Sequence, residues 1–286
     1  DTSGADVLAT IRERGLDCRV AMVTAVEPDV DILEMGFDLN AHAWGEWETR
    51  NRVWDVAGIR HLVKPSVQWR TVRTAGDARA GFRPIERDVF RTGMDDLDLS
   101  AYSHIDDLRA YSVLRAGVGN SVIARSQSGK AREWMRLDLF HDLRMPEDDA
   151  MEDESLLLTR IELNPAYWIH LDLQSRFDTD GLDLADSFAS LRLVDGDVWE
   201  LDIASQFIRD DLEQYLVTFA YKVFENMRFI SSVGYDAETS RFFEQTYGVQ
   251  IGLANYWDLY FSINTREGST RNNETRFEFK IKPARF

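Results

Sequence analysis

Most of the chain, from residue 39 to residue 286, alternates between apolar and polar positions with a period of two. In the segment 165–177, for example, Ile169, Leu171 and Leu173 share one face. The other face carries a polar residue at every second position, namely His170, Asp172, Gln174 and Arg176. Successive side chains of a β-strand point to opposite faces, so this pattern predicts strands with one apolar face and one polar face.

The alternation is clearest towards the C-terminus, where it predicts strands within 165–177, 197–208, 211–225, 227–235, 241–253, 256–265 and 273–286. Less regular strands are expected near 40–50, 52–59, 61–73, 108–124, 131–144 and 155–163. Turn-like sequences separate strands at 178–181, 194–197, 208–211 and 266–273. Short turns between long strands predict an antiparallel meander of about a dozen strands. The acidic or irregular segments 74–107 and 145–154 are expected to be long loops.

The first 38 residues have a different texture. Apolar residues at helical spacing before Gly15 predict a helix within 5–15, and the apolar run 18–26 predicts a buried strand. A second helix is expected to begin near Pro28 and to end near Gly36. We therefore expect two parts: an α/β fragment over 1–38 and a β domain over 39–286.

Composition limits the classes of function. The formal net charge is -17, which argues against nucleic acid as a partner, because phosphates attract positive surfaces. A single cysteine, Cys18, excludes a disulfide within the chain. No apolar run is long enough for a transmembrane helix, but a transmembrane strand needs only about 10 residues.

Alternating strands are also found in soluble β-sandwiches, so a soluble binding module remains an alternative. Long strands and mixed charges on the polar faces favour an outer-membrane β-barrel, complete or partial. On this interpretation the polar residues His170, Asp172, Gln174 and Arg176 are candidates for the lumen. Aromatic residues expected near strand ends are candidates for the membrane interface: Trp199, Tyr215, Tyr235, Tyr247 and Trp257.

The segments 58–70, 114–143, 156–178 and 240–263 resemble the C-terminal barrel of the lipopolysaccharide-assembly outer-membrane protein, also called the organic solvent tolerance protein. The resemblance implies a protein of the outer membrane that inserts lipopolysaccharide into the outer leaflet. It also implies membrane lipid, a plug lipoprotein and the barrel-assembly machinery as partners. The terminal aromatic, Phe286, resembles the assembly signal of such barrels. Residues 39–286 lack the family's periplasmic domain and its disulfide cysteines, and they hold about half of its strands.

Residues 1–38, and 15–38 most clearly, resemble a fragment of the receiver domain of haloarchaeal-type response regulators, in which Thr24 matches the hydroxyl residue that contacts the phosphoryl group. The phosphoacceptor Asp and the Lys of that family have no counterpart at the matching positions, so we expect Thr24 to be an inactive switch. A cytoplasmic response regulator is the alternative that this resemblance implies. The two families do not normally share a chain, so a chimeric join near 38/39 is a further interpretation.

No pattern of residues predicts catalysis. The five histidines lack metal-ligand spacing, and no nucleophile–base set can be recognised. The acidic stretch 145–154 is expected to be a solvated loop, with weak cation binding as the alternative. We therefore expect a protein that is not an enzyme and that holds no metal and no cofactor.

Overall fold

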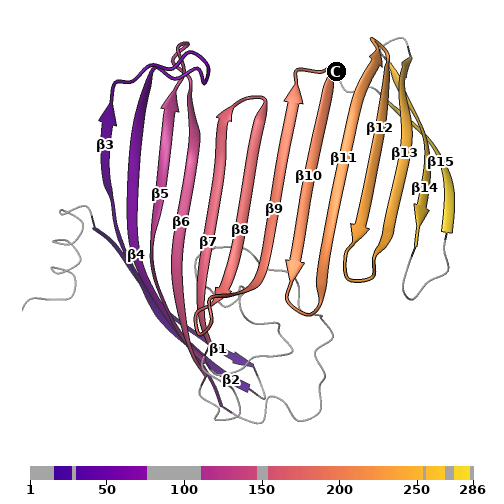
Figure 1. Cartoon of the computed structure of the whole chain (residues 1–286). Helices are drawn as coiled ribbons and strands as arrows, with labels where there is room; N and C mark the ends of the chain where they lie inside the picture. The colour runs from indigo at the N-terminus through magenta and orange to yellow at the C-terminus, as the bar shows by residue number, and fades with distance from the viewer. Residues whose placement is uncertain are drawn as a thin grey trace, which may run out of the picture. The chain divides into compact units, whose positions relative to one another are not determined.

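The computed structural model describes residues 16–27, 30–75, 111–146, 154–253, 256–267 and 274–283. All regular structure within these ranges is β-strand, joined by turns (Figure 1). The strands are β1 (Leu16–Glu27), β2 (Val30–Ala41), β3 (Ala43–Trp47), β4 (Gly58–Ala75), β5 (Tyr111–Arg125), β6 (Ala131–Pro146), β7 (Glu154–Ala166), β8 (Ile169–Asp178), β9 (Asp183–Asp195), β10 (Trp199–Ile208), β11 (Leu212–Phe224), β12 (Met227–Asp236), β13 (Arg241–Leu253), β14 (Trp257–Arg266) and β15 (Glu274–Pro283).

The strands follow one another as an antiparallel meander, in the order β1-β2-β4-β5 and onwards in sequence to β15. This confirms the all-β antiparallel fold that the alternation predicts. The contacts divide the chain into two compact units. Unit 1 holds Asp1–Ile161 and Ser175–Ala185, and unit 2 holds Glu162–Gln174 and Asp186–Phe286.

The long strand β4 has two neighbours along one edge. Residues of β2 pair with Ser66–Ala75, and β3 pairs with Ile59–Val63. The register is the same in both, so β2 and β3 continue a single line that breaks beside Lys64 and Pro65. On its other edge β4 pairs with β5 without a break.

Burial in unit 1 is opposite to that of an ordinary soluble domain, where charged side chains are almost never fully buried unless they are paired. Among its described residues, Arg115 and Asp142 are 2% and 0% exposed. Several large apolar residues of the neighbouring positions are exposed instead, namely Leu39, Leu137, Leu139, Leu143 and Met145. The alternating positions therefore form two faces, and the polar face is the more buried one.

Unit 2 shows the same separation of faces across β10–β15. One cross-strand row of paired positions runs Tyr221, Phe229, Val249, Phe261 and Phe279. A parallel row on the polar face runs Asp202, Thr218, Ser232, Thr246, Asn264 and Arg276. The apolar face is largely exposed at the C-terminal end, where Phe277 and Phe279 are 77% and 54% exposed.

The structure corrects three of the predicted elements. The expected helix near 28–36 is wrong, because Val30–Ala41 forms β2, which is paired on both edges; pairing with β1 and β4 overrides the local helix signals. The expected strand 52–59 is wrong as well, since 52–55 is a turn closed by the bridge between Asn51 and Val56.

The third correction concerns 165–177, where the alternation predicts a single strand. A two-residue turn, Tyr167–Trp168, separates β7 from β8 there. Aromatic residues are not typical turn formers, so the break expected between 163 and 165 lies a few residues before the observed turn. The turns expected at 178–181, 194–197 and 208–211 agree closely with the observed ones at 179–182, 196–198 and 209–211.

Several predictions fall on residues outside the described ranges. These are the helix within 5–15, most of the loops 74–107 and 145–154, and the terminal Phe286. The division at 38/39 stays a prediction, although β2 passes through that position without interruption. Across the described residues, no helix is long and apolar enough to cross a membrane.

Candidate functional site on the polar face

The polar face of unit 1 is organised around a buried ion pair. Arg115 on β5 and Asp142 on β6 are directly paired positions. The guanidinium donates two hydrogen bonds to the carboxylate: Nε to Oδ1 at 2.6 Å and Nη2 to Oδ2 at 2.8 Å. The Arg115 guanidinium also lies 5.9 Å from the ring centre of Phe140 on the same face. Such a bidentate pair fixes both side chains in one geometry.

Two more ion pairs extend this face. On one side Arg70 of β4 contacts Asp38 of β2, with 3.1 Å between Nη2 and Oδ2. On the other side Arg136 contacts Asp138, both on β6, with 2.9 Å between Nε and Oδ2. Each of these charges therefore has an opposite charge beside it, which offsets part of the cost of removing it from water.

Glycines make room for large side chains on this face. Gly117 is paired with Phe140, and a Cβ at Gly117 would collide with the Leu139 carbonyl oxygen and the Phe140 ring. Gly36 is paired with Arg70, and a Cβ at Gly36 would collide with the Arg70 side chain. The position of each large side chain therefore depends on a residue without a side chain on the adjacent strand.

A hollow of about 260 Å³ opens on the polar face of unit 1. Its lining is mainly polar, and it includes Lys64, Arg136, Asp138, Asn40 and Ser121. Arg136 and Asp138 are paired with each other, and the Ser121 hydroxyl donates to Glu133. The lining can therefore form hydrogen bonds with water or a polar solute.

The polar face of unit 2 has its own network. Glu200 forms two ion pairs: its Oε1 lies 2.5 Å from Nη2 of Arg192, and its Oε2 lies 3.0 Å from Nη2 of Arg228. Further along the strands, the hydroxyls of Thr218 and Ser232 are 3.1 Å apart. The Thr246 hydroxyl donates to the Asn264 side chain at 2.7 Å. The face is thus hydrophilic along its length, with both signs of charge.

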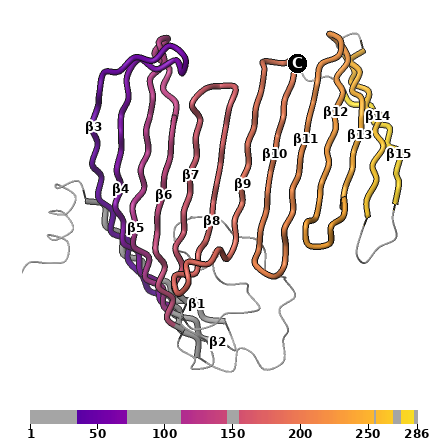
Figure 2. Tube along the Cα trace, in the orientation of Figure 1, coloured from indigo at the N-terminus to yellow at the C-terminus, as the bar shows by residue number. Residues whose placement is uncertain are grey.

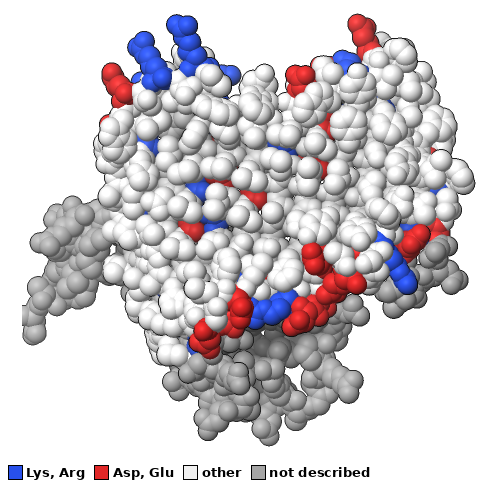
Figure 3. All heavy atoms as spheres, in the orientation of Figure 1, with Lys and Arg blue, Asp and Glu red and all other residues white. Residues whose placement is uncertain are grey.

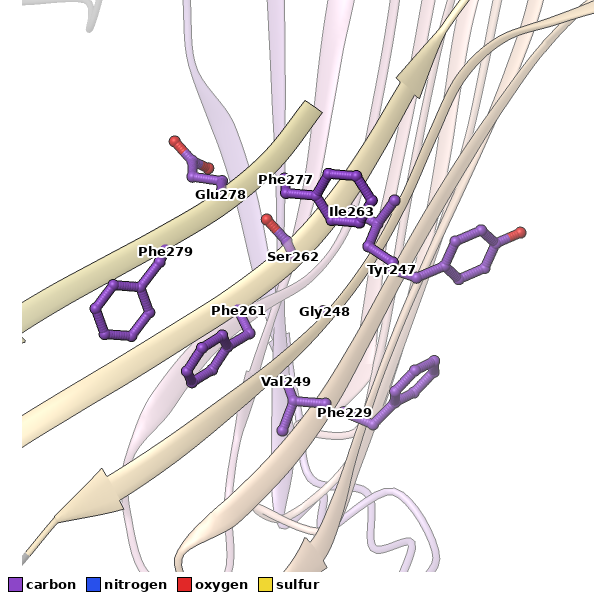
Figure 4. A pocket seen from close by; sticks show the side chains of 10 residues that line it. All are labelled: Phe229, Tyr247, Gly248, Val249, Phe261, Ser262, Ile263, Phe277, Glu278 and Phe279. Carbon is purple, nitrogen blue, oxygen red and sulfur yellow. The ribbon is translucent and has the colours of Figure 1, made fainter. Parts of the chain in front are cut away.

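The opposite face of unit 2 is apolar and carries a hollow of about 460 Å³ over β12–β15. Figure 4 shows Phe279, Phe261 and Val249 projecting to one side of the strands. Ser262 and Glu278 project to the other side, and Gly248 has no side chain to add. This hollow is a gap between rows of exposed apolar side chains, and its lining is mainly apolar.

The residues predicted to face a lumen all lie on β8. Because they occupy alternate positions, His170, Asp172, Gln174 and Arg176 share one face of that strand. The His170 ring contacts the Asn164 side chain, and the Gln174 amide donates to Asp172 at 3.1 Å. The first three belong to unit 2 and Arg176 belongs to unit 1. Their exposure to a lumen stays a prediction.

The predicted interfacial aromatics are distributed unevenly along their strands. Trp199 and Trp257 begin β10 and β14, and Tyr235 lies next to the end of β12. Tyr215 is near the start of β11 and its hydroxyl donates to Glu213, whereas Tyr247 lies in the middle of β13. A place at the membrane interface stays a prediction for these residues.

Thr24 lies in β1, opposite Leu33 of β2. The expected strand is therefore present, and its neighbour is a strand of the meander. The proposed receiver role of Thr24 stays a prediction. Within the described part of the chain, no group of three or more His, Cys, Asp or Glu side chains could hold a metal ion.

The sequence did not identify the residues that organise the polar face, Arg115, Asp142 and Glu200. A signal for the first two exists, because Arg115 and Asp142 lie on the two arms of a hairpin around the turn 126–130. Charges recur at alternate positions of the second arm, at Arg136, Asp138, Asp142 and Arg144, and Arg115 is the single charge in the middle of the first arm. The exact pairing depends on a bulge between the arms, which the alternation does not reveal.

Comparisons with known proteins give limited likenesses. No family model matches the chain. A putative transcriptional regulator of Haloferax volcanii is 74% identical over 38 residues, which are 13% of this chain and 6% of that protein. The chain thus matches only a small part of that relative's length.

Among solved structures, one described as "Asymmetric conductivity of engineered proteins" is 11% identical, with a TM-score of 0.35, over 93% of this chain and 95% of its own. A mutant of the porin of Rh. blastica is 9% identical, also with a TM-score of 0.35, over 93% and 97%. TM-scores this low do not establish a common fold.

Proposed function

We propose that the chain forms part of the wall of an outer-membrane β-barrel, with its apolar face towards lipid and its polar face towards water. One observation carries the proposal: the fully buried charges lie on one face, while large apolar side chains are exposed on the other. In water an apolar surface of this extent is a liability, whereas in a bilayer it is the favoured exterior.

The lengths of the strands support the same proposal. Every strand from β4 to β15 has at least 10 residues, and β4 has 18. Strands of about 9–11 residues suffice to span the apolar core of a bilayer when they are tilted. Strands in soluble proteins are most often about 5–6 residues long. The strands are therefore long enough to span a membrane, and they are longer than the strands of most soluble sandwiches.

Within this class, we propose lipopolysaccharide transport and assembly as the specific activity. The support is the resemblance of four segments, 58–70, 114–143, 156–178 and 240–263, to that family's barrel. The paired charges and hydroxyls of the polar face suit a hydrated path for the polar part of such a lipid. A plug lipoprotein, the barrel-assembly machinery and the outer membrane itself would then be its partners.

Cysteine accessibility in vesicles tests the membrane orientation. Single cysteines replace Phe261 or Ile263 on the apolar face, and Ser262 or Asn264 on the polar face, in a Cys18→Ser background. We expect a water-soluble maleimide to label the polar-face cysteines and to spare those on the apolar face. Equal labelling of both faces, or a folded protein that stays soluble without detergent or lipid, would favour a soluble β-sandwich instead.

A signalling role is the second candidate, and the 38-residue match to a putative transcriptional regulator favours it. A working receiver needs a phosphoacceptor carboxylate, which the sequence does not supply beside the segment of Thr24. We expect no incorporation of phosphate from acetyl phosphate into the whole chain. Stable incorporation that is lost on Thr24→Ala substitution would favour the regulator.

A further inference from the structure

At one end of unit 1, two connections between strands pack together and form a single ordered surface. The connection 48–57 between β3 and β4 meets the turn 126–130 between β5 and β6 (Figure 2). The Ala57 amide donates to the Arg125 carbonyl at 2.7 Å, and the Gln127 amide donates to the Asp55 carboxylate at 3.0 Å. The Arg132 side chain also donates to the Trp54 carbonyl.

The first of these connections is itself fixed by hydrogen bonds. The backbones of Asn51 and Val56 exchange two hydrogen bonds of 2.8 Å. The Asn51 side-chain oxygen accepts from the amides of Val53 and Trp54 at 3.0 and 3.2 Å. The surface is therefore held in one arrangement before any partner arrives, which lowers the entropic cost of binding.

This surface is positively charged in a strongly acidic chain. Residues 43–60 and 124–132 together hold six Lys or Arg and three Asp or Glu, a balance of +3, against -17 for the whole chain. Figure 3 shows blue side chains gathered over this end of unit 1. The opposite end of the same unit carries the turn with Asp178, Asp180 and Asp183.

Four of the cations remain available for a partner, and we call them the basic rim: Arg50, Arg52, Arg125 and Lys130. All four are exposed, and within the described part of the chain none has a carboxylate within ion-pair distance. Two of the three acidic residues nearby are already engaged. Glu46 binds Arg60 at 2.5 Å, and Asp55 accepts the Gln127 amide.

Large apolar side chains lie beside the basic rim. Val53 at the tip of the connection is 76% exposed, and Trp47 at the end of β3 is 52% exposed. Trp47 lies on the apolar face of β3, whereas Trp44 lies on the polar face, where the Arg60 guanidinium is 5.6 Å from its ring centre. Exposed Trp beside Lys and Arg is the combination that proteins place at the level of lipid headgroups.

We infer that the basic rim, with Trp47, binds the phosphate groups of anionic lipid headgroups at the membrane surface. This inference rests on the proposed function, because it requires the ends of the strands to lie at the interface. Phosphate matches the unpaired guanidinium groups, which bind it through paired hydrogen bonds. The exposed Trp and Val side chains suit the adjoining acyl region. Nucleic acid fits poorly, because the rest of the chain is strongly acidic.

The test compares the full chain in vesicles of phosphatidylcholine that contain trace spin-labelled phosphatidylglycerol or spin-labelled phosphatidylcholine. Electron paramagnetic resonance measures the fraction of each probe that is immobilised by the protein. We expect the anionic probe to be preferred. Replacing the basic rim by Gln should reduce the preference by about fivefold for each cation in contact with the surface. Raised salt should also reduce it.

A matched control removes four cations elsewhere, through Gln at Arg241, Arg276, Lys280 and Lys282 of unit 2. This variant should keep the preference, and circular dichroism should show equal strand content in all three proteins. Equal loss in both variants would mean a general charge effect and would overturn the inference. Displacement of the probe by low concentrations of inorganic phosphate would also overturn it, in favour of a site for free phosphate.

Cysteine accessibility on the same samples separates the two proposals. If the polar and apolar faces label as expected but the wild-type protein shows no lipid preference, the inference about the basic rim fails and the membrane proposal stands. If the faces label equally, the membrane proposal fails and this inference fails with it.

Discussion

Arg115 and Asp142 face each other across β5 and β6, joined by two short hydrogen bonds and almost completely buried. Removing one partner leaves the other charge buried without compensation. We expect Asp142→Leu to lower the free energy of unfolding by about 3–5 kcal/mol, measured by urea denaturation in detergent micelles. The double variant Arg115→Met with Asp142→Leu should recover most of that loss.

The exposed pair Arg276–Glu274 is the control, because its side chains are more than half exposed. Arg276→Gln should change the same free energy by less than about 1 kcal/mol. If breaking either pair lowered the free energy of unfolding by a similar amount, burial of Arg115 and Asp142 would contribute little to stability.

Gly117 is predicted to be intolerant of any side chain. Gly117→Ala places a Cβ against the Leu139 carbonyl oxygen and the Phe140 ring, so the β5–β6 pairing must shift. We expect a loss of about 1–3 kcal/mol in the free energy of unfolding, by the cost typical of overpacking. Gly252→Ala is the matched control, since a Cβ there meets its nearest neighbours at ordinary contact distances of 3.7 Å and above.

Truncating Phe140 shows whether the Phe140 ring or the Leu139 carbonyl oxygen excludes a side chain at position 117. The double variant Gly117→Ala with Phe140→Ala removes the ring but keeps the backbone oxygen. It should remain destabilised relative to Phe140→Ala alone. Full recovery would show that the ring, and not the backbone, sets the requirement for glycine.

Adjacent residues on β14 should respond oppositely to a charge. Phe261 lies on the apolar face and Ser262 lies on the polar face. In lipid, Phe261→Arg should cost about 2–4 kcal/mol, whereas Ser262→Arg should cost much less. Reversible unfolding from vesicles measures both. If the two substitutions cost the same, the assignment of the lipid-facing side is wrong.

Asp197, in the turn between β9 and β10, should titrate below the ordinary range of a carboxyl group. The Lys222 ammonium hydrogen-bonds the carboxylate and lowers the pKa of Asp197 from its ordinary value of 3.8. Because the folded-state pKa is lower than the unfolded-state pKa, the contact stabilises the fold fully at a pH above the unfolded-state pKa. This contribution disappears as the pH falls through the folded-state pKa.

Carbon-13 NMR of labelled Asp side chains in micelles measures this titration. Lys222→Met should return the pKa of Asp197 towards its ordinary value. Lys282→Met, which removes a cation from β15, should leave it unchanged. A pKa of Asp197 that does not respond to Lys222→Met would show that the contact is absent in solution.

Alternation of residue types predicts most of the strands after β2 and their two faces, because only an extended strand places every second side chain on the same side. It misses β9, which lies in none of the predicted strands, and β2, where a helix is expected. It does not say which face is buried, since soluble and membrane sheets share the same period. The pairing of Arg115 is also beyond its reach. The register of β5 and β6 shifts between Val122 and Ile123. Without that shift, Arg115 would face His141 and the ion pair would not form.

The hairpin between β7 and β8 shows a second limit. The sequence has a turn signal at Asn164-Pro165, and the expected strands 155–163 and 165–177 break there, but the turn itself lies further along at Tyr167 and Trp168. Its ends are fixed by pairing with other strands, as in the hydrogen bond from the Val194 amide to the Trp168 carbonyl at 2.9 Å. Turn residues chosen for their surroundings, and not for backbone preference, escape prediction from local sequence.

The break between β2 and β3 has its origin on the neighbouring strand. The two strands keep one register along β4, and the interruption lies beside Pro65, whose ring nitrogen has no hydrogen to donate. The segment from Val30 to Trp47 is therefore one line along the same edge of β4, with a local gap in its pairing. Both halves keep the same register on β4, which stays paired with β5 across the gap. A single imino acid thus interrupts the pairing along this edge without shifting the alignment of the strands on either side of it.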